Sequence, residues 1–154
     1  MAEQQNQQAQ AIPLLKFSAH HYRAEGVDEQ AFAKWYQEEQ IPRMMNLLKK
    51  HGIDRYKLYI TPASLRSVFQ EDLVKLKGTL PGWKMAPFDV TSSYWVTDPD
   101  KLRGLLSDPD WEGKVVAFEK DWIDTSKAEV QIGWESTYLE DGEIVNVAET
   151  KEYD

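Results

Sequence analysis

Apolar and polar residues alternate with a period of two in four separate segments, and this pattern constrains the fold more than any other feature of the chain. The segments are residues 12–21, 53–60, 88–96 and 129–139. Such alternation predicts strands that turn one face toward a core. Helical patterns separate the strands. Asp28 is a candidate N-cap for the first helix, and Asp98-Pro99 and Asp108-Pro109 are typical openings for two more, which extend to about Leu106 and Trp122.

The order strand, helix, strand, strand, helix, strand predicts an α+β fold. It is the ferredoxin-like βαββαβ arrangement, a four-stranded antiparallel sheet with helices on one face. In this interpretation the opposite face carries Val, Trp and Tyr side chains that need cover. A second copy of the same sheet supplies that cover with one self-complementary patch. We therefore expect a homodimer, a dimeric α/β barrel.

Three local features complete the predicted fold. Pro42 is expected to interrupt the first helix, with a second helical stretch over residues 44–50. Residues 62–87 form the least regular segment; they include a possible helix at 64–77, and a segment of this kind is often a binding loop or lid. Asp141-Gly142 predicts a hairpin turn, followed by a short edge strand at residues 143–147.

The length of 154 residues fits one domain. We expect a disordered, glutamine-rich leader at residues 1–10, a domain at 11–148 and a loose, charged tail at 149–154. The start of the chain has neither a signal-peptide pattern nor an arginine-rich transit pattern. No apolar run approaches the roughly 20 residues that a membrane span requires. These features favour a cytoplasmic protein.

Composition excludes several kinds of chemistry. The chain has no cysteine, which removes disulfides, thiolate nucleophiles and zinc-thiolate sites. A formal net charge of -8 disfavours nucleic acid and anionic membranes as partners. No phosphate-binding glycine loop, nucleophile elbow or metal-ligand spacing of histidines is present. The sequence therefore predicts no cofactor and no metal, with His20-His21 and a carboxylate left open as the alternative metal site.

Three stretches resemble the EthD-domain family. The first is Tyr22-Arg23-Ala24-Glu25-Gly26 after the first strand, and the second is the helix with Phe32, Trp35 and Tyr36 that precedes Pro42. The third combines Ile132-Gly133-Trp134 with the stretch from Tyr138 to Val145. From about residue 12 to 147 the chain is similar to the small fungal decarboxylases that act on anthrone-type polyketide acids. The resemblance implies a dimeric α/β barrel and an enzyme of fungal secondary metabolism.

One position departs from the family pattern. The family usually has a His-x-Pro motif at the end of the first helix, whereas this chain has Gln40-Ile41-Pro42. Glutamine forms hydrogen bonds but does not titrate, so an acid-base role at this position must have moved or changed. The resemblance therefore supports the fold more strongly than it supports decarboxylation.

The candidate catalytic residues are His20, His21 and Asp89. The two histidines are neighbours on the first strand, so they point to opposite faces of the sheet, and histidine is the natural proton carrier near neutral pH. Asp89 falls in a polar set on the third strand, where burial is expected to raise the pKa of a carboxyl group. Either histidine is open to the alternative of a purely structural role.

The candidate substrate-binding residues are mostly aromatic. Aromatic side chains could stack on a flat polycyclic phenol, although each by itself is better explained as core. Lys84, in the irregular segment, could meet a substrate carboxylate, and Gln40 could donate a hydrogen bond. The aromatic candidates are Tyr22, Tyr59, Tyr94, Trp95 and Trp122.

These features lead to one functional hypothesis with open alternatives. The sequence predicts a cofactor-independent lyase or isomerase that acts on an aromatic polyketide or phenolic intermediate by general acid-base catalysis, with decarboxylation of a polyketide acid as the first choice. Dehydration or cyclisation of the same class of substrate needs the same few groups. A non-catalytic accessory protein that binds a metabolite is the alternative outside enzymes.

Overall fold

The structure is a computed structural model that describes residues 14–153. A four-stranded antiparallel sheet lies at its centre, in the order β2-β3-β1-β4. This is the predicted ferredoxin-like α+β topology, which the structure confirms. The predicted leader at residues 1–10 lies outside the described residues. The strands are β1 Leu15–His21, β2 Arg55–Ile60, β3 Val90–Val96 and β4 Glu129–Trp134.

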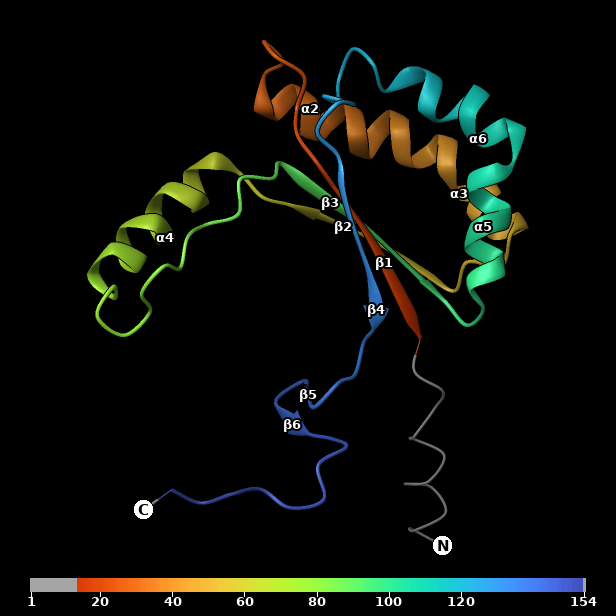
Figure 1. Ribbon diagram of the computed structural model, residues 1–154. Helices are drawn as coiled ribbons and strands as arrows, with labels where there is room; N and C mark the ends of the chain where they lie inside the picture. Colours follow the sequence, from red (N-terminus) through yellow and green to blue (C-terminus); the bar gives the residue numbers. More distant parts are fainter. Residues whose placement is uncertain (1–13, 154) are drawn as a thin grey trace, which may run out of the picture.

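The helices fall into two groups (Figure 1). One group covers a face of the sheet, while α4 projects away from it as a separate arm. No helix among residues 14–153 is long and apolar enough to span a bilayer. The helices are α2 Glu29–Trp35, α3 Ile41–Lys50, α4 Ala63–Lys75, α5 Pro99–Ser107 and α6 Pro109–Lys114, with a π-helical turn at Tyr36–Gln40 and a 3-10 turn at Val116–Phe118.

Aspartate caps begin three of these helices, as the sequence predicts. The side chain of Asp28 accepts a hydrogen bond from the Ala31 amide at 3.0 Å. Asp98 and Asp108 accept from the amides two residues ahead, each at 2.9 Å, and a proline follows each of them. Proline is well placed there because its missing N–H is one that a helix start leaves unpaired.

Pro42 does not interrupt the helix, contrary to the prediction. Helical backbone continues from Glu29 to Lys50 through the π-helical turn. In this turn the Ile41 amide donates to the Tyr36 carbonyl, five residues back. The wider turn brings Pro42 to the start of α3, where no N–H is needed. The extra residue in the turn therefore accommodates the proline.

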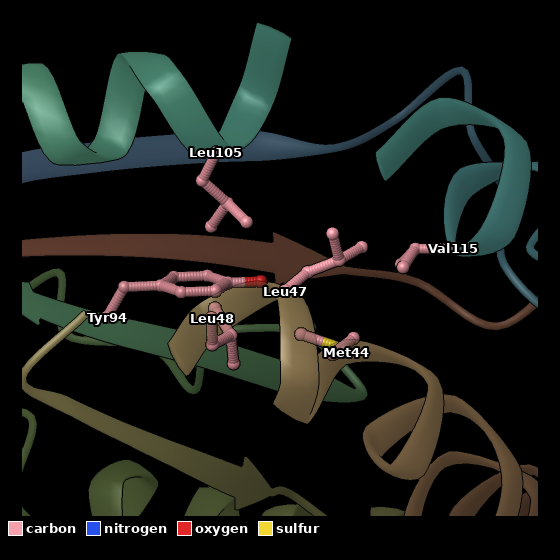
Figure 2. Packing of buried hydrophobic residues seen from close by; sticks show 6 residues of the cluster. All are labelled: Met44, Leu47, Leu48, Tyr94, Leu105 and Val115. Atoms are coloured by element: carbon pink, nitrogen blue, oxygen red, sulfur yellow. The ribbon is translucent and has the colours of Figure 1, made fainter. Parts of the chain in front are cut away.

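The alternation of side chains divides the sheet into two unlike faces. Residues opposite each other in an antiparallel pair share a face, so Phe17 lies with Tyr94, while His20 lies with Thr91. The first face is covered by helices and holds the core. Figure 2 shows Tyr94 pointing toward α3, with Leu105 of α5 and Val115 closing the cluster. The second face carries mainly polar side chains and has no helix layer over it.

That division corrects the expected basis for dimerisation. The face away from the helices is polar rather than rich in Val, Trp and Tyr. Val130, Ile132 and Trp134 of β4 pair with Ala19, Phe17 and Leu15, so they lie on the helix side of the sheet. They are nevertheless 65%, 58% and 65% exposed, because the helices do not reach this edge strand.

The segment at residues 62–87 contains the predicted helix, here α4. None of the residues of α4 is buried, and its apolar side chains are exposed, including Leu65 and Phe69 at 56% and 54%. Arg66 holds the base of this arm, since its Nη1 donates to the carbonyls of Thr61 and Phe88. The arm therefore stands beside the open face of the sheet.

Two elements near the C-terminal end are shorter than predicted. The helix from Pro109 ends at Lys114 instead of Trp122, and a 3-10 turn at Val116–Phe118 follows it after Val115. The fourth strand ends at Trp134. The turn at Asp141 and Gly142 is confirmed, with φ angles of 50° and 79°.

This turn joins two short strands that stand apart from the main sheet. β5 Leu139–Glu140 pairs only with β6 Glu143–Ile144, so the expected edge strand at residues 143–147 does not extend the four-stranded sheet. Residues 149–153 contain neither helix nor strand.

Candidate active site on the open face

A cavity of about 650 Å³ lies on the open face of the sheet, between the strands and the arm that contains α4. That volume lies within the range of small-molecule binding sites. Strand residues whose side chains alternate toward this face form its floor, and α4 with residues 85–88 forms an apolar wall. The floor includes Lys16, Ser18, His20, Tyr59, Thr91 and Ser93, and the wall includes Leu65, Phe69, Met85 and Phe88.

His20 is the titratable ring at this floor. Its Nδ1 lies 2.8 Å from the Thr91 hydroxyl on the neighbouring strand. On its other side the imidazole stacks on Phe88, with ring centroids 4.5 Å apart and planes at 17°. These two contacts fix the ring orientation and leave Nε2 as the nitrogen for a substrate. A positioned imidazole can donate or accept a proton near neutral pH.

One end of the cavity carries positive charge. The Lys16 ammonium lies 4.9 Å from the centre of the buried Trp95 ring, and Arg55 and Lys57 face the same ring at 5.7 and 5.8 Å. The Glu135 carboxylate offsets part of this positive charge. It accepts hydrogen bonds from the Lys16 ammonium and from the Trp95 indole, each at 2.7 Å. Lys16 and Glu135 line the cavity, whereas Arg55 and Lys57 lie around Trp95 outside its lining, so the surroundings of this end carry a net positive charge.

His21 lies on the opposite face, beneath the helices. Burial, assisted by the charge of His20, lowers its pKa to about 4. Its Nδ1 is buried without a hydrogen-bond partner among residues 14–153. His21 is therefore neutral at pH 7 and does not meet a ligand in the cavity.

Asp89 does not line the cavity. Its carboxylate accepts from the Arg23 amide at 2.9 Å and from the Arg23 side chain at 3.0 Å, and it lies 3.7 Å from the Arg66 guanidinium. It thus ties the end of β1 and the base of α4 to the sheet. This position favours a structural role.

The aromatic candidates are distributed over both faces and do not form one pocket. Tyr59 lines the cavity, and Trp95 lies beneath its charged end. Tyr94 is in the core under the helices, where Trp122 also stacks on Trp35 with centroids 5.2 Å apart. Tyr22 packs edge-on against Phe88 at 5.3 Å without lining the cavity.

The two remaining candidates also lie apart from the cavity. Lys84 is exposed and does not line it, and Gln40 is fully buried on the helix side. Residues 14–153 contain no group of three or more His, Cys, Asp or Glu side chains that could hold a metal ion.

Among the cavity residues that sequence reasoning did not name as candidates, four carried a signal in the alternation of their strands. Lys16 and Ser18 alternate with the apolar residues of β1 onto the face of His20, and Thr91 and Ser93 do the same on β3. The pairing register, in which Ser18 lies opposite Ser93 and His20 opposite Thr91, brings the two polar sets together. Recognising that these sets are neighbours required the strand order.

Both the sequence and the fold of this chain are similar to those of known proteins. The model of the EthD domain family matches residues 24–126, two thirds of the chain. The chain belongs to the EthD domain family. An EthD family protein from Bacillus halodurans has a similar structure, with a TM-score of 0.52 and 16% identity over 80% of this chain and 99% of that one.

Three fungal relatives are named as enzymes of different kinds. The dehydratase iacD of Pestalotiopsis fici is 31% identical over 134 residues, which cover 87% of this chain and 94% of the relative. A protein of Aspergillus terreus, named as an oxygenase, is 26% identical over 88% of this chain and 82% of the relative. The decarboxylase nsrE of Aspergillus novofumigatus is 24% identical over 81% of this chain and 80% of the relative.

Proposed function

We propose that this protein is a cofactor-independent lyase that acts on an aromatic polyketide or phenolic acid in the open-face cavity. The observation that carries the proposal is His20, held by Thr91 and Phe88 at the floor of a cavity of about 650 Å³. The cations Lys16 and Arg66 of the cavity lining fit a carboxylate, and the apolar side chains of Tyr59, Leu65 and Phe69 fit a flat apolar ring system.

Decarboxylation is the reaction that these groups support best. The carboxylate leaves as CO₂, and the electron pair of the broken carbon-carbon bond passes into a carbonyl group of the substrate. Protonated His20 then donates a proton to the ring carbon and regains one from solvent. The protein supplies the proton, the orientation of the acid and a site shielded by the arm.

Dehydration of the same class of substrate is the second candidate. It is favoured by the identity of 31% to the dehydratase iacD. In this reaction the imidazole removes a proton from carbon, and the neighbouring hydroxyl leaves as water once it is protonated. A histidine at the floor of the cavity serves both reactions, so the product distinguishes them.

The test is turnover of a panel of hydroxylated aromatic carboxylic acids, with loss of CO₂ and loss of water measured separately by mass spectrometry. We expect His20→Ala to lose at least about 100-fold in turnover, because general acid-base groups contribute about 100- to 10,000-fold. His21→Ala is the matched control, since it removes the same side chain from the other face.

The outcome for the two histidines decides the proposal. If His20→Ala stays within about threefold of the parent on a turned-over acid, His20 is not the proton-transfer group. If the acids bind at the cavity and none reacts, the protein is the metabolite-binding accessory protein that the sequence leaves open.

We also propose a homodimer. It is supported by the exposed apolar side chains of β4, where Ile132 and Trp134 are 58% and 65% exposed on an edge strand. Sedimentation should give about twice the chain mass of 17.9 kDa. Ile132→Glu should shift the protein to monomer, and the matched change Leu65→Glu on the arm tests whether the contact includes α4. A monomeric parent protein would contradict the proposal.

A further inference from the structure

Two elements of this chain project from its body with little packing to hold them. The helix α4 has 13 residues, and none of them is buried. Among residues 14–153 the hairpin of β5 and β6, residues 138–147, pairs with no other strand, and each of its strands has two residues. Short helices and two-stranded hairpins are at best marginally stable by themselves in water. Both elements therefore need a further surface to pack on.

The arm, residues 62–87, carries apolar side chains on two opposite sides of α4. Leu65 and Phe69, one turn apart, line the cavity. Val74 is nine residues after Leu65, which at 3.6 residues per turn places it on the opposite side of the helix. Its side chain is 58% exposed. A helix that is apolar on opposite sides is ordinarily covered on both. The cavity accounts for one side of α4, so the other side is open to a partner.

The hairpin has an exposed surface that is also partly apolar. Tyr138 and Ile144 are 58% and 60% exposed. The charged side chains of the hairpin are all acidic, namely Glu140, Asp141 and Glu143. Apolar side chains surrounded by charge of one sign favour a partner surface that is apolar at its centre and opposite in charge.

The arm has the opposite charge. It contains four basic and two acidic residues, a net charge of +2 in a chain whose total is -8. Residues 135–153 contain six acidic residues and one basic residue, a net charge of -5. Within residues 14–153, Lys75 and Lys77 of the arm and Glu140 and Glu143 of the hairpin form no salt bridge. The charges of the two elements are therefore complementary and free to pair.

The arm and the hairpin leave the sheet at opposite ends. The arm follows Ile60, which lies opposite Val90 at the His21 end of β1. The hairpin follows β4, whose last residue, Trp134, lies opposite Leu15 at the other end of β1. In Figure 1 the two elements accordingly stand apart. A twofold axis that runs across the strands reverses their direction in a second copy, so it brings the arm end of one copy to the hairpin end of the other.

We propose that the arm of each copy packs on the β5–β6 hairpin of a second copy of this chain, so that two identical contacts join a dimer. This contact presupposes the proposed homodimer and defines a surface for it. It also affects the cavity, because Leu65 and Phe69 of the arm form part of the cavity wall. When the second copy holds the arm, that wall is fixed, and the site is complete only in the dimer.

Cross-linking tests the contact directly, because the chain has no cysteine of its own. Val74→Cys and Ile144→Cys are introduced together into the full chain, which is then treated with a short bismaleimide. A contact between copies joins two chains, so we expect a band at twice the chain mass of 17.9 kDa on a denaturing gel. Val74→Cys with Leu106→Cys, at an exposed leucine of α5, is the matched control and should remain at the mass of one chain.

Charge reversal supplies a second test. Lys75→Glu with Lys77→Glu makes the arm negative, and Glu140→Lys with Glu143→Lys makes the hairpin positive. Each double variant alone sets like charges against each other in both contacts, so its dimer should have a dissociation constant at least about tenfold higher in sedimentation. An equal mixture of the two variants restores opposite charges in both contacts, and its dissociation constant should return to within about threefold of the parent value.

The control for charge reversal is Lys34→Glu with Lys120→Glu. These exposed lysines lie outside the arm and the hairpin, so the same change in net charge should leave the dissociation constant unchanged.

The outcomes separate this contact from the homodimer itself. A cross-link within one chain overturns the proposal, because the chain's own hairpin then covers the arm. A dimer that forms no cross-link overturns it as well, since another surface then covers the arm, and so does a mixture that dissociates as readily as the separate variants. In these cases the homodimer stands. A monomeric parent protein overturns both the homodimer and the contact.

Discussion

His20 and His21 are adjacent on β1, yet the two faces of the sheet give them different properties. His20 lies at the floor of a cavity, with a hydroxyl on one side and a phenyl ring on the other. His21 lies under the helices, where burial lowers its pKa to about 4. The comparison shows that residue type and position along the chain do not decide the chemistry of a histidine. The face to which the side chain points decides it.

The two faces also differ in what they contribute to stability. The helix-covered face holds both clusters of buried apolar side chains, one around Met44 and Leu105 and the other around Phe32 and Trp35. The open face holds mainly polar side chains and an arm with no buried residue. Folding free energy is therefore concentrated on one side of the sheet, and access for a substrate is on the other.

The largest effect that separates the two sides is on stability. Leu105→Ala removes a fully buried side chain from the covered face and should cost about 2–5 kcal/mol of unfolding free energy. Leu65→Ala, the same change on the arm where the side chain is 56% exposed, should cost less than about 0.5 kcal/mol. Urea unfolding of the two variants measures both. Equal losses would show that the arm is part of the folding core.

The next largest effect is the pH dependence of the unfolding free energy that His21 causes. Its pKa in the folded chain, about 4, lies below the ordinary value of 6.5, so the unfolded state binds the proton first as the pH falls. Stability is fully present above pH 6.5 and is lost toward pH 4, by on the order of 3 kcal/mol at most. Compared with His21→Gln, the parent should lose stability between pH 7 and about pH 5.

Two controls isolate the contribution of His21 to the pH dependence of stability. Glu119 acts with the opposite sign, because its raised pKa costs stability as the pH rises through about 7, so His21 must be isolated by comparing variants. His20→Gln, on the open face, is the control and should retain the pH dependence of the parent. A parent and a His21→Gln variant with parallel pH profiles would mean that His21 is solvated in the folded protein.

The smallest effect concerns the hydrogen bond that positions His20. Thr91→Val removes the hydroxyl 2.8 Å from Nδ1 and keeps the shape of the side chain. We expect about a fivefold loss in turnover, because a hydrogen bond of this kind contributes about 1 kcal/mol. Ser93→Ala, a neighbour on the same strand, is the control. A pH profile that shifts in Thr91→Val and not in Ser93→Ala would distinguish positioning from packing.

Much of the fold could be predicted because it depends on local chemistry. The aspartate caps at Asp28, Asp98 and Asp108 and the turn at Asp141-Gly142 are set by hydrogen bonds and backbone preferences within a few residues. The predictions failed where the backbone can accommodate a residue in more than one conformation. At Pro42 a π-helical turn replaced a break, which no local pattern indicates.

The candidate site was predicted less completely, because it depends on which strands are neighbours. The alternation of β1 placed His20 and His21 on opposite faces of the sheet. It could not show that Thr91 and Ser93 complete the same floor. Sequence reasoning did not identify Glu119, because a glutamate after a short helix is ordinarily solvated. The tertiary structure half-buries this side chain against Gln40, and burial raises its pKa to about 7.

The sequence by itself determined the order of the elements, the two faces of each strand and the absence of thiol chemistry, because these follow from side-chain period, turn chemistry and composition. Tertiary structure alone decided that His20 meets a cavity while His21 is buried, and that Gln40 retains an unpaired oxygen beside Glu119. The reason is that burial is a property of three-dimensional packing. Alternation shows that two residues face apart, and only the placement of the helices shows which of the two faces is dry.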